Sequence, residues 1–146
     1  MNFEFNSKVI ERYTEMNHFG RLIDLNLIGL EKGACTYQIL VKEELLATTN
    51  VIHGGVLSAI MDTIMGVAAL TEMEEQKKLV ATLEFKITYF NPAFINDTLQ
   101  GKGKVLQSGK RIIYSEGVIT NQDGVVICKG TGTFNAYPAE KVGLII

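Results

Sequence analysis

Few cysteines, little net charge and no leader-like start narrow the classes of protein to which this sequence can belong. Of its 146 residues two are cysteines, Cys35 and Cys128, which lie far apart and form neither a disulfide framework nor the spacing of a metal site. The formal net charge of −2 gives no electrostatic reason to expect a nucleic-acid partner. The start of the chain lacks the basic residues and apolar run of a signal peptide. We therefore expect a reduced, cytoplasmic protein.

The chain also lacks repeats, low-complexity segments and linkers, which favours one domain over several. Apolar residues make up 47% of the sequence, so we expect a sizeable core and no extensive disorder. Near the start, Ser7 is well placed to cap a short amphipathic helix, whose apolar residues recur at helical spacing: Val9, Ile10, Tyr13 and Met16. We predict a single domain over residues 1–146, in which residues 1–21 form a helical extension.

One stretch, residues 53–70, is apolar almost throughout and predicts a long helix that begins at Gly54 and Gly55. Because apolar residues occur nearly all the way round this helix, we expect it to be buried. It is shorter than an ordinary membrane span and carries a carboxylate near its middle, so we do not expect it to cross a membrane. One face of the predicted helix consists of small residues at steps of three and four: Gly55, Ser58, Ala59, Asp62, Gly66 and Ala69.

Asp62 is the one ionisable group within this stretch after its first residue, and a carboxylate among apolar neighbours is costly unless it is satisfied or used. It is either a structural group, hydrogen-bonded to a nearby amide or hydroxyl, or an acid/base catalyst. The glycines Gly54 and Gly55 favour catalysis, because the first amides of a helix have no intrahelical partner and bind developing negative charge. We expect a carboxylate two turns further along the same helix to be in reach of this anion site, a pairing that indicates a hydrolytic site.

Six strand-like segments flank the predicted helix, and short connections between the last four favour antiparallel pairing. In the first of those four, Leu83, Phe85, Ile87 and Tyr89 alternate with Thr82, Glu84, Lys86 and Thr88, so we expect the two sets to occupy opposite faces. The six segments are residues 22–31, 34–41, 79–90, 98–106, 111–120 and 125–135.

Glycines are unusually frequent in the predicted strands. Glycine weakens a flat strand, so a group of them requires a reason, such as the close approach of another element or sharp curvature. A sheet bent around the helix over residues 54–71 would supply both reasons. We therefore predict an α+β fold in which an antiparallel sheet wraps around one long central helix. The strand glycines are Gly101, Gly103, Gly117, Gly130 and Gly132.

This pattern resembles the hotdog-fold acyl-CoA thioesterases of the PaaI-like (phenylacetic acid degradation) type. The resemblance rests on His53-Gly54-Gly55, on Asp62 and Gly66, and on the strand end 83–93, and it covers roughly residues 22–134. It implies hydrolysis of an acyl-CoA thioester, without a cofactor, by a homodimer or a dimer-of-dimers tetramer. In this family two sheets join edge to edge, and the active sites lie at the dimer interface.

The resemblance also implies roles for individual residues. Asp62 matches the catalytic carboxylate, which acts as general base on water or as nucleophile. Gly54 matches the residue whose backbone amide binds the thioester oxygen, and His53 matches the position that helps to orient the thioester. Thr82 lies where relatives often carry Ser or Thr, supplied across the dimer to position water or the carboxylate. The amide of Gly55 is a further expected substrate contact.

The sequence departs from the family pattern in the segment before the helix. Many relatives carry an Asn six residues before the His and a Gly three residues before it, whereas this chain has Ala47 and Asn50. The family's Asn helps to hold substrate or water near the carboxylate. Asn50, Thr48 or Thr49 could take over this contact, and we name Asn50 as the substrate-binding candidate.

Coenzyme A carries phosphates, so we expect basic residues near the mouth of the pocket. Lys110 and Arg111, at a predicted turn, are the candidates for phosphate contact, although charged turns are more often simply solvated. The acyl group itself is not readable from the sequence. The residues expected to line an aliphatic or aryl pocket are Leu57, Met61, Met65, Phe85, Phe90 and Phe94.

Other functions fit the sequence less well. A serine triad of Ser58, His53 and Asp62 would place the nucleophile inside a helix without a nucleophile elbow. His53 and Asp62 lack a third metal ligand, so no metal is expected. A non-catalytic acyl-CoA-binding sensor or partner module on the same fold is the main alternative, because fold does not determine function. Ala47 favours this binding module, whereas Asp62 together with Gly54 favours the enzyme.

Overall fold

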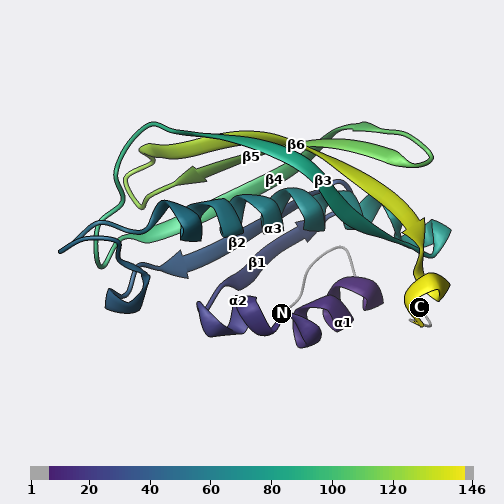
Figure 1. The fold of residues 1–146 in the computed structure, drawn as a ribbon, viewed down its shortest axis with the longest axis horizontal. Helices are drawn as coiled ribbons and strands as arrows, with labels where there is room; N and C mark the ends of the chain where they lie inside the picture. The colour runs from purple at the N-terminus through teal and green to yellow at the C-terminus, as the bar shows by residue number, and fades with distance from the viewer. Residues whose placement is uncertain (1–6, 144–146) are drawn as a thin grey trace.

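The computed structural model describes residues 7–143, and Figure 1 shows how its elements are arranged. A curved sheet arches over one long helix, and two short N-terminal helices lie on the other side of that helix. The helices are α1 (Lys8–Met16), α2 (His18–Leu22) and α3 (Gly54–Met73), with short 3-10 helices at Glu43–Leu45, Glu74–Gln76 and Ala139–Val142. The strands are β1 (Asn26–Glu31), β2 (Ala34–Leu40), β3 (Lys78–Tyr89), β4 (Thr98–Ser108), β5 (Ile112–Thr120) and β6 (Val126–Pro138).

The six strands form one antiparallel sheet in the order β1-β2-β4-β5-β6-β3. The predicted pairing of successive strands therefore holds for β4, β5 and β6, while β3 crosses over to pair with β6 at the end of the sheet. β1 and β3 are the two edge strands. The predicted α+β class and the sheet wrapped around a central helix are both confirmed, and this arrangement is the hotdog fold.

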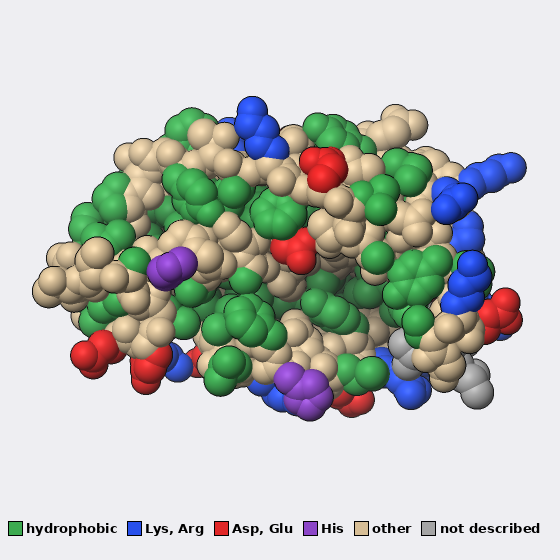
Figure 2. Space-filling view, in the orientation of Figure 1, with side chains coloured by type: hydrophobic (Ala, Val, Ile, Leu, Met, Phe, Trp, Pro, Cys, Tyr) green, Lys and Arg blue, Asp and Glu red, His purple; other side chains and the backbone are tan. Residues whose placement is uncertain are grey.

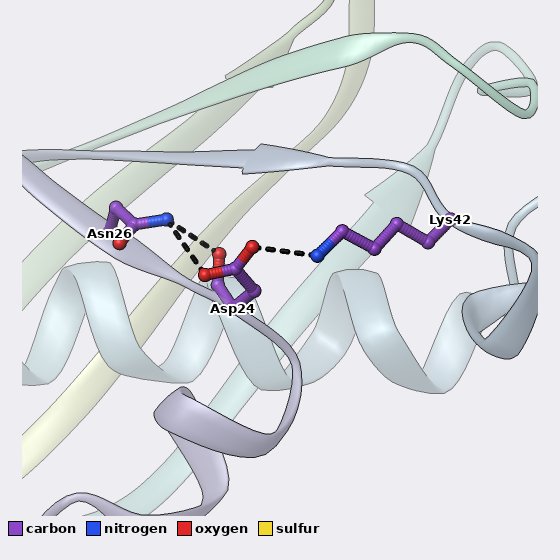
Figure 3. Close-up of polar contacts among 3 residues, drawn as sticks. All are labelled: Asp24, Asn26 and Lys42. Carbon is purple, nitrogen blue, oxygen red and sulfur yellow. Dashed lines mark hydrogen bonds and ion pairs between the residues drawn. The ribbon is translucent and has the colours of Figure 1, made fainter.

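The first strand begins later than predicted, because residues 18–22 form α2 and the chain then turns sharply. Asp24 has the left-handed φ of 58°, a conformation that Asp tolerates better than most residues. Its carboxylate is 2.7 Å from the Lys42 ammonium, and the side-chain amide of Asn26 donates to its backbone oxygen over 2.8 Å (Figure 3). The hydrogen bonds from Lys42 and then from Asn26 hold the pKa of Asp24 below its ordinary value. These contacts tie the start of β1 to the chain just after β2.

The central helix α3 is longer than predicted, ending at Met73 rather than at residue 71. Together with the 3-10 turn that follows, the segment Gly54–Gln76 has the length and the apolar composition of a membrane-spanning helix. Our expectation that it is shorter than an ordinary membrane span was therefore wrong. In the fold this helix is the core element: the sheet covers most of it, and its large side chains are buried beneath the strands. Those with 0% or 1% exposure are Ile60, Met61, Ile64, Met65 and Met73.

Glycines line the surface of the sheet that faces α3, as the sequence predicts. A Cβ atom at Gly103 would overlap the backbone carbonyl of Ile64, and one at Gly117 would lie 2.5 Å from the Met61 sulfur. Gly103 is paired with Gly117, and Gly117 with Gly130, so the three form a row across β4, β5 and β6. This row lets the helix backbone approach the sheet more closely than side chains would allow.

We predict that Gly103→Ala lowers the free energy of unfolding by at least about 3 kcal/mol, because the added methyl group overlaps helix backbone that cannot move independently. Urea unfolding followed by circular dichroism measures the loss. The control is Gly29→Ala on β1, where a Cβ atom would make an ordinary contact of 3.4 Å with Thr36, and we expect a change below about 1 kcal/mol. Equal losses in the two variants would contradict the role assigned to the glycine row.

Candidate active site

A cleft of about 830 Å³ lies between α1, α3 and the β3–β6 edge of the sheet. Figure 2 shows this face, with a hollow near its centre surrounded by hydrophobic side chains. The floor of the cleft is a face of α3 that the sheet leaves uncovered, and of the predicted small-residue face only Asp62 and Gly66 belong to it, while Ala69 is fully buried. From α3 it is lined by Asp62, Thr63, Gly66, Val67 and Leu70, from β3 by Leu79, Val80 and Thr82, from β6 by Phe134 and Tyr137, and from α1 chiefly by Val9, Tyr13 and Met16.

Asp62 lies at this cleft and is half-buried, although the helix that carries it is largely buried, as expected. The hydroxyl of Thr82 donates a hydrogen bond of 2.7 Å to Asp62 Oδ1. Thr82 thus meets the carboxylate of its own chain, whereas the sequence led us to expect this contact across a dimer. Asp62 Oδ2 receives no hydrogen bond from the described residues, so one carboxylate oxygen is held and the other is open to the cleft.

A β-bulge explains how Thr82 reaches Asp62. On β6, Phe134 pairs with Thr82 and its neighbour Thr133 pairs with Glu84, so Leu83 has no partner and the alternation of faces shifts there. Thr82 therefore points toward α3, as Phe85 does. The prediction that these two residues occupy opposite faces was wrong, because the extra residue in β3 resets the two-residue period.

The N-terminus of α3 carries one free and one occupied glycine amide. His53 is the N-cap, and its Nδ1 accepts a hydrogen bond of 2.8 Å from the amide of Gly55. The amide of Gly54 makes no hydrogen bond to any residue between 7 and 143. The prediction that both amides are uncovered was therefore wrong for Gly55. The free Gly54 amide, at the positive end of the helix dipole, is suited to bind an oxyanion.

Tyr89, at the end of β3, holds the first turn of α3 in place. No role in the site was predicted for this residue. Its hydroxyl donates to the carbonyl oxygen of Gly54 over 3.0 Å and lies 2.5 Å from the hydroxyl of Ser58. The Ser58 hydroxyl also donates to the same carbonyl over 3.1 Å. The sequence contains one signal for this contact, because the alternating pattern of the strand places Tyr89 on the face that points toward the helix. The serine is thus engaged in holding the helix start.

Asp62 and Gly54 of one chain cannot act on the same thioester. They are eight residues apart on an unbroken helix, which separates them by about 12 Å along its axis. A reacting carbonyl has to lie within about 3 Å of both its oxyanion donor and the attacking group. The expectation that the two groups are within reach of each other in one chain was therefore wrong.

Four other predicted binding residues do not line the cleft. Asn50 is exposed in the loop before α3, where its backbone oxygen accepts from Ile95 over 2.9 Å. Lys110 and Arg111 are exposed at the β4–β5 turn, and Arg111 Nε donates to Asn135 over 3.2 Å. Gly55 is likewise absent from the lining residues.

None of the six side chains expected to line an acyl pocket lies in the cleft. Leu57, Met61 and Met65 are buried under the sheet, whereas Phe90 and Phe94 are 56% and 43% exposed. The helix face directed at the cleft is the one with Asp62 and Gly66, and the bulky residues Leu57, Met61 and Met65 lie on other faces of α3, in the core. The cleft lining therefore had to come from α1 and from the shifted face of β3.

The remaining nucleophilic and titratable groups nearby are either buried or belong to α1. Burial raises the pKa of Cys35 to about 12 and that of Cys128 to about 12, so both thiols stay protonated. Burial and then the negative charge of Asp62 raise the pKa of Tyr13, an effect that the Thr63 side chain partly offsets. Tyr13 thus lies near the carboxylate, a neighbour that the sequence interpretation missed. Between residues 7 and 143, no three His, Cys, Asp or Glu side chains gather into a possible metal site.

Comparison with known proteins agrees with this architecture. The family described as the thioesterase superfamily matches residues 49–128. A putative esterase of Saccharolobus solfataricus is 30% identical over 128 residues, covering 87% of this chain and 89% of that protein. Human acyl-coenzyme A thioesterase 13 is 26% identical, covering 86% of this chain and 90% of that protein. The PaaI protein from the phenylacetic acid degradation operon of Escherichia coli has a similar structure, with a TM-score of 0.82 at 20% identity over 88% of this chain and 90% of that one.

The Tyr89 contacts generate a stability prediction. Tyr89→Phe removes the hydroxyl that holds the Gly54 carbonyl, so we expect the free energy of unfolding to fall by about 1 kcal/mol. The control is Tyr114→Phe, because the Tyr114 hydroxyl makes no hydrogen bond within the described part of the chain and its side chain is 39% exposed. Urea denaturation compares the two variants, and a Tyr89→Phe protein as stable as the control would show that the hydroxyl does not secure the helix start.

Proposed function

The chain belongs to the thioesterase superfamily and is a thioester hydrolase, and from this premise we propose that its substrate is an acyl-CoA, which it hydrolyses to the free acid and coenzyme A. The observation that carries the proposal is the half-buried Asp62, held by Thr82 through one oxygen and open to a cleft through the other. The relative acyl-coenzyme A thioesterase 13 supports the choice of a CoA thioester, since it aligns with this chain over nearly its whole length.

Asp62 is the proposed base. In this scheme a water oxygen attacks the thioester carbon while its proton passes to Asp62 Oδ2, and the Thr82 hydroxyl keeps the carboxylate in orientation. The tetrahedral intermediate then collapses, the carbon–sulfur bond breaks, and the departing thiolate takes up the proton. Direct attack by the Asp62 carboxylate, giving an anhydride that water hydrolyses, uses the same geometry. In both cases one oxygen must be free, which the single hydrogen bond from Thr82 allows.

The amide of Gly54 is the proposed oxyanion donor. It is unpaired, it belongs to the first helical residue of α3, and the cap from His53 to Gly55 fixes its direction. His53 thereby positions the donor as part of the helix cap. Tyr89 secures the same turn from the side of the sheet. A preorganised donor of this kind stabilises the oxyanion without further movement of the protein.

A second copy of the chain has to complete the site, because Asp62 and Gly54 of one chain are about 12 Å apart. A twofold axis beside α3 would make the two central helices antiparallel and place Gly54 of the partner subunit beside Asp62. The edge strand β3 supports such a dimer. Its outer edge pairs with no other strand within residues 7–143, and Leu83 and Tyr89 are 58% and 48% exposed.

We propose further that the phosphate and substrate contacts expected from the sequence exist in this protein. Lys110 and Arg111 contact the phosphates of coenzyme A from the exposed β4–β5 turn, where Lys78 adds a third cation by donating to the Lys110 carbonyl over 2.6 Å. Asn50, in the loop before α3, contacts the substrate near the Gly54 amide. Assembly of two dimers into a tetramer and a cytoplasmic location stay predictions from the sequence.

The role of Asp62 predicts the behaviour of an isosteric variant. Asp62→Asn keeps the acceptor for Thr82 but cannot accept a proton, so we expect kcat to fall at least about 100-fold. Release of free thiol from acyl-CoA substrates gives the rate, and unfolding in urea shows that the fold is retained. Turnover within twofold of wild type would remove Asp62 from the mechanism.

The oxyanion donor can be removed without disturbing the helix. Gly54→Pro deletes the amide hydrogen at the first helical position, where proline is well accepted, and His53 already has the extended backbone that precedes proline, with φ −69° and ψ 131°. We expect kcat to fall by roughly 100- to 1,000-fold. Gly54→Ala is the matched control, because it keeps the amide and its Cβ atom would lie an ordinary 3.6 Å from Tyr89. If both variants hydrolyse acyl-CoA equally well, the donor lies elsewhere.

Neutralising Lys110 and Arg111 together tests the phosphate contact. We expect the Lys110→Gln/Arg111→Gln variant to raise KM several-fold for acyl-CoA with little change in kcat, since the charges act on binding rather than on the reacting carbonyl. The same variant should hydrolyse a pantetheine thioester, which lacks the nucleotide, as well as wild type does. A lowered kcat with unchanged KM would argue against phosphate contact.

A further inference from the structure

The cleft that contains Asp62 continues along α3 beyond the residues assigned to catalysis. After Asp62 and Thr63, its floor passes Gly66 and Val67 and ends at Leu70. Asp62 and Leu70 are two turns apart, so this floor is about 12 Å long at a rise of about 1.5 Å per residue. Nothing in the proposed hydrolysis of the thioester itself requires this length.

The far part of the cleft is largely apolar. Leu79 of β3 and its pairing partner Tyr137 of β6 form the side that belongs to the sheet, and Val9 lies on the α1 side, close to the end of α3. Leu79 precedes Thr82 by three residues on β3, which places it about 10 Å from the carboxylate end. Apart from Asp62, the charged side chains that line the cleft within the described chain all come from α1 and are exposed, so they form a rim: Lys8, Glu11, Arg12 and Glu15.

The wall opposite the sheet is the N-terminal helix α1, which contributes more lining residues than any other element. Ile10, 1% exposed, anchors the helix to the core, and Ser7 caps its start by accepting from the Ile10 amide over 3.0 Å. Val9, Tyr13 and Met16 form the stripe that faces the cleft. This helix lies outside residues 49–128, the segment that matches the thioesterase superfamily.

Building on the proposed function, we infer that this cleft is the acyl chamber, that α1 is its specificity-determining wall, and that the substrate class is a straight-chain aliphatic acyl-CoA of roughly eight to ten carbons. With its carbonyl at Asp62, such a chain would extend to Leu70 and Leu79 at carbon–carbon bonds of about 1.5 Å. A single aromatic ring would fill only the half nearest Asp62 and leave the apolar far end in contact with water.

The first measurement is kcat/KM for the wild-type protein over a panel of straight-chain acyl-CoAs from two to sixteen carbons, with benzoyl-CoA and phenylacetyl-CoA included. We expect kcat/KM to rise by roughly fourfold per methylene, the gain from burying each group, up to roughly eight to ten carbons and then to stop rising. A flat profile, or a preference for either aryl thioester over all aliphatic ones, would overturn the inference.

The second measurement shortens the chamber. Leu79→Trp places a large ring at the far end, so we expect kcat/KM for decanoyl-CoA to fall at least about tenfold while that for butyryl-CoA stays within about twofold of wild type. The control is Ile112→Trp, an exposed position that does not line the cleft, which should leave the chain-length profile unchanged. Should Leu79→Trp fail to fold, Val80→Phe, on the same strand and lining the same cleft, replaces it.

These results separate the chamber from the proposed function. If Asp62→Asn is inactive and Leu79→Trp lowers the rate equally for all chain lengths, hydrolysis at Asp62 stands and the acyl chamber is refuted. If Asp62→Asn retains activity, the proposed mechanism fails. A shift of the kcat/KM profile toward shorter acyl chains in Leu79→Trp would still support the acyl chamber.

Discussion

The sheet packs directly against the backbone of α3, and this contact decides which faces of the helix are enclosed. The helix backbone at Ile64 lies so near β4 that only glycine fits at position 103, and the row through Gly117 and Gly130 extends this contact across the sheet. The bulky faces of the helix are thereby enclosed. The face of the helix with Asp62 and Gly66 stays uncovered by the sheet. The packing that forms the core therefore also decides where a carboxylate can meet a substrate.

Much of the fold could be predicted because it rests on periodicity. The buried helix, the antiparallel strands and the reason for the strand glycines follow from the apolar pattern and from the cost of glycine in strands. The side on which Thr82 lies could not be predicted in this way. A single unpaired residue, Leu83, shifts the strand by one position, and periodicity contains no signal for such a bulge. The opening of a cleft beside Asp62 could not be predicted either, because amphipathicity does not show which helix face the sheet leaves open.

The parts of the site that were missed come from tertiary contacts between distant segments. Tyr89 reaches the Gly54 carbonyl from the end of β3, and Tyr13 reaches the cleft from α1. The alternation of β3 places Tyr89 on the face toward the helix, but no local signal identifies its partner on α3 or brings Tyr13 to the cleft. The sequence likewise does not distinguish the two glycine amides at the start of α3. The His53 side chain accepts a hydrogen bond from the Gly55 amide, whereas the Gly54 amide stays free within the described residues. Simple helix geometry then separates Gly54 from Asp62, so a complete site requires two chains.

The central claim, that Asp62 acts with Gly54 of the partner subunit, is tested most directly by mixing two inactive variants. Asp62→Asn and Gly54→Pro chains are unfolded together, refolded, and assayed for acyl-CoA hydrolysis, with mass spectrometry to show that mixed dimers form. Each mixed dimer would contain one intact site, so the account predicts recovery of up to about a quarter of the wild-type rate. Mixed dimers without any recovered activity would contradict it.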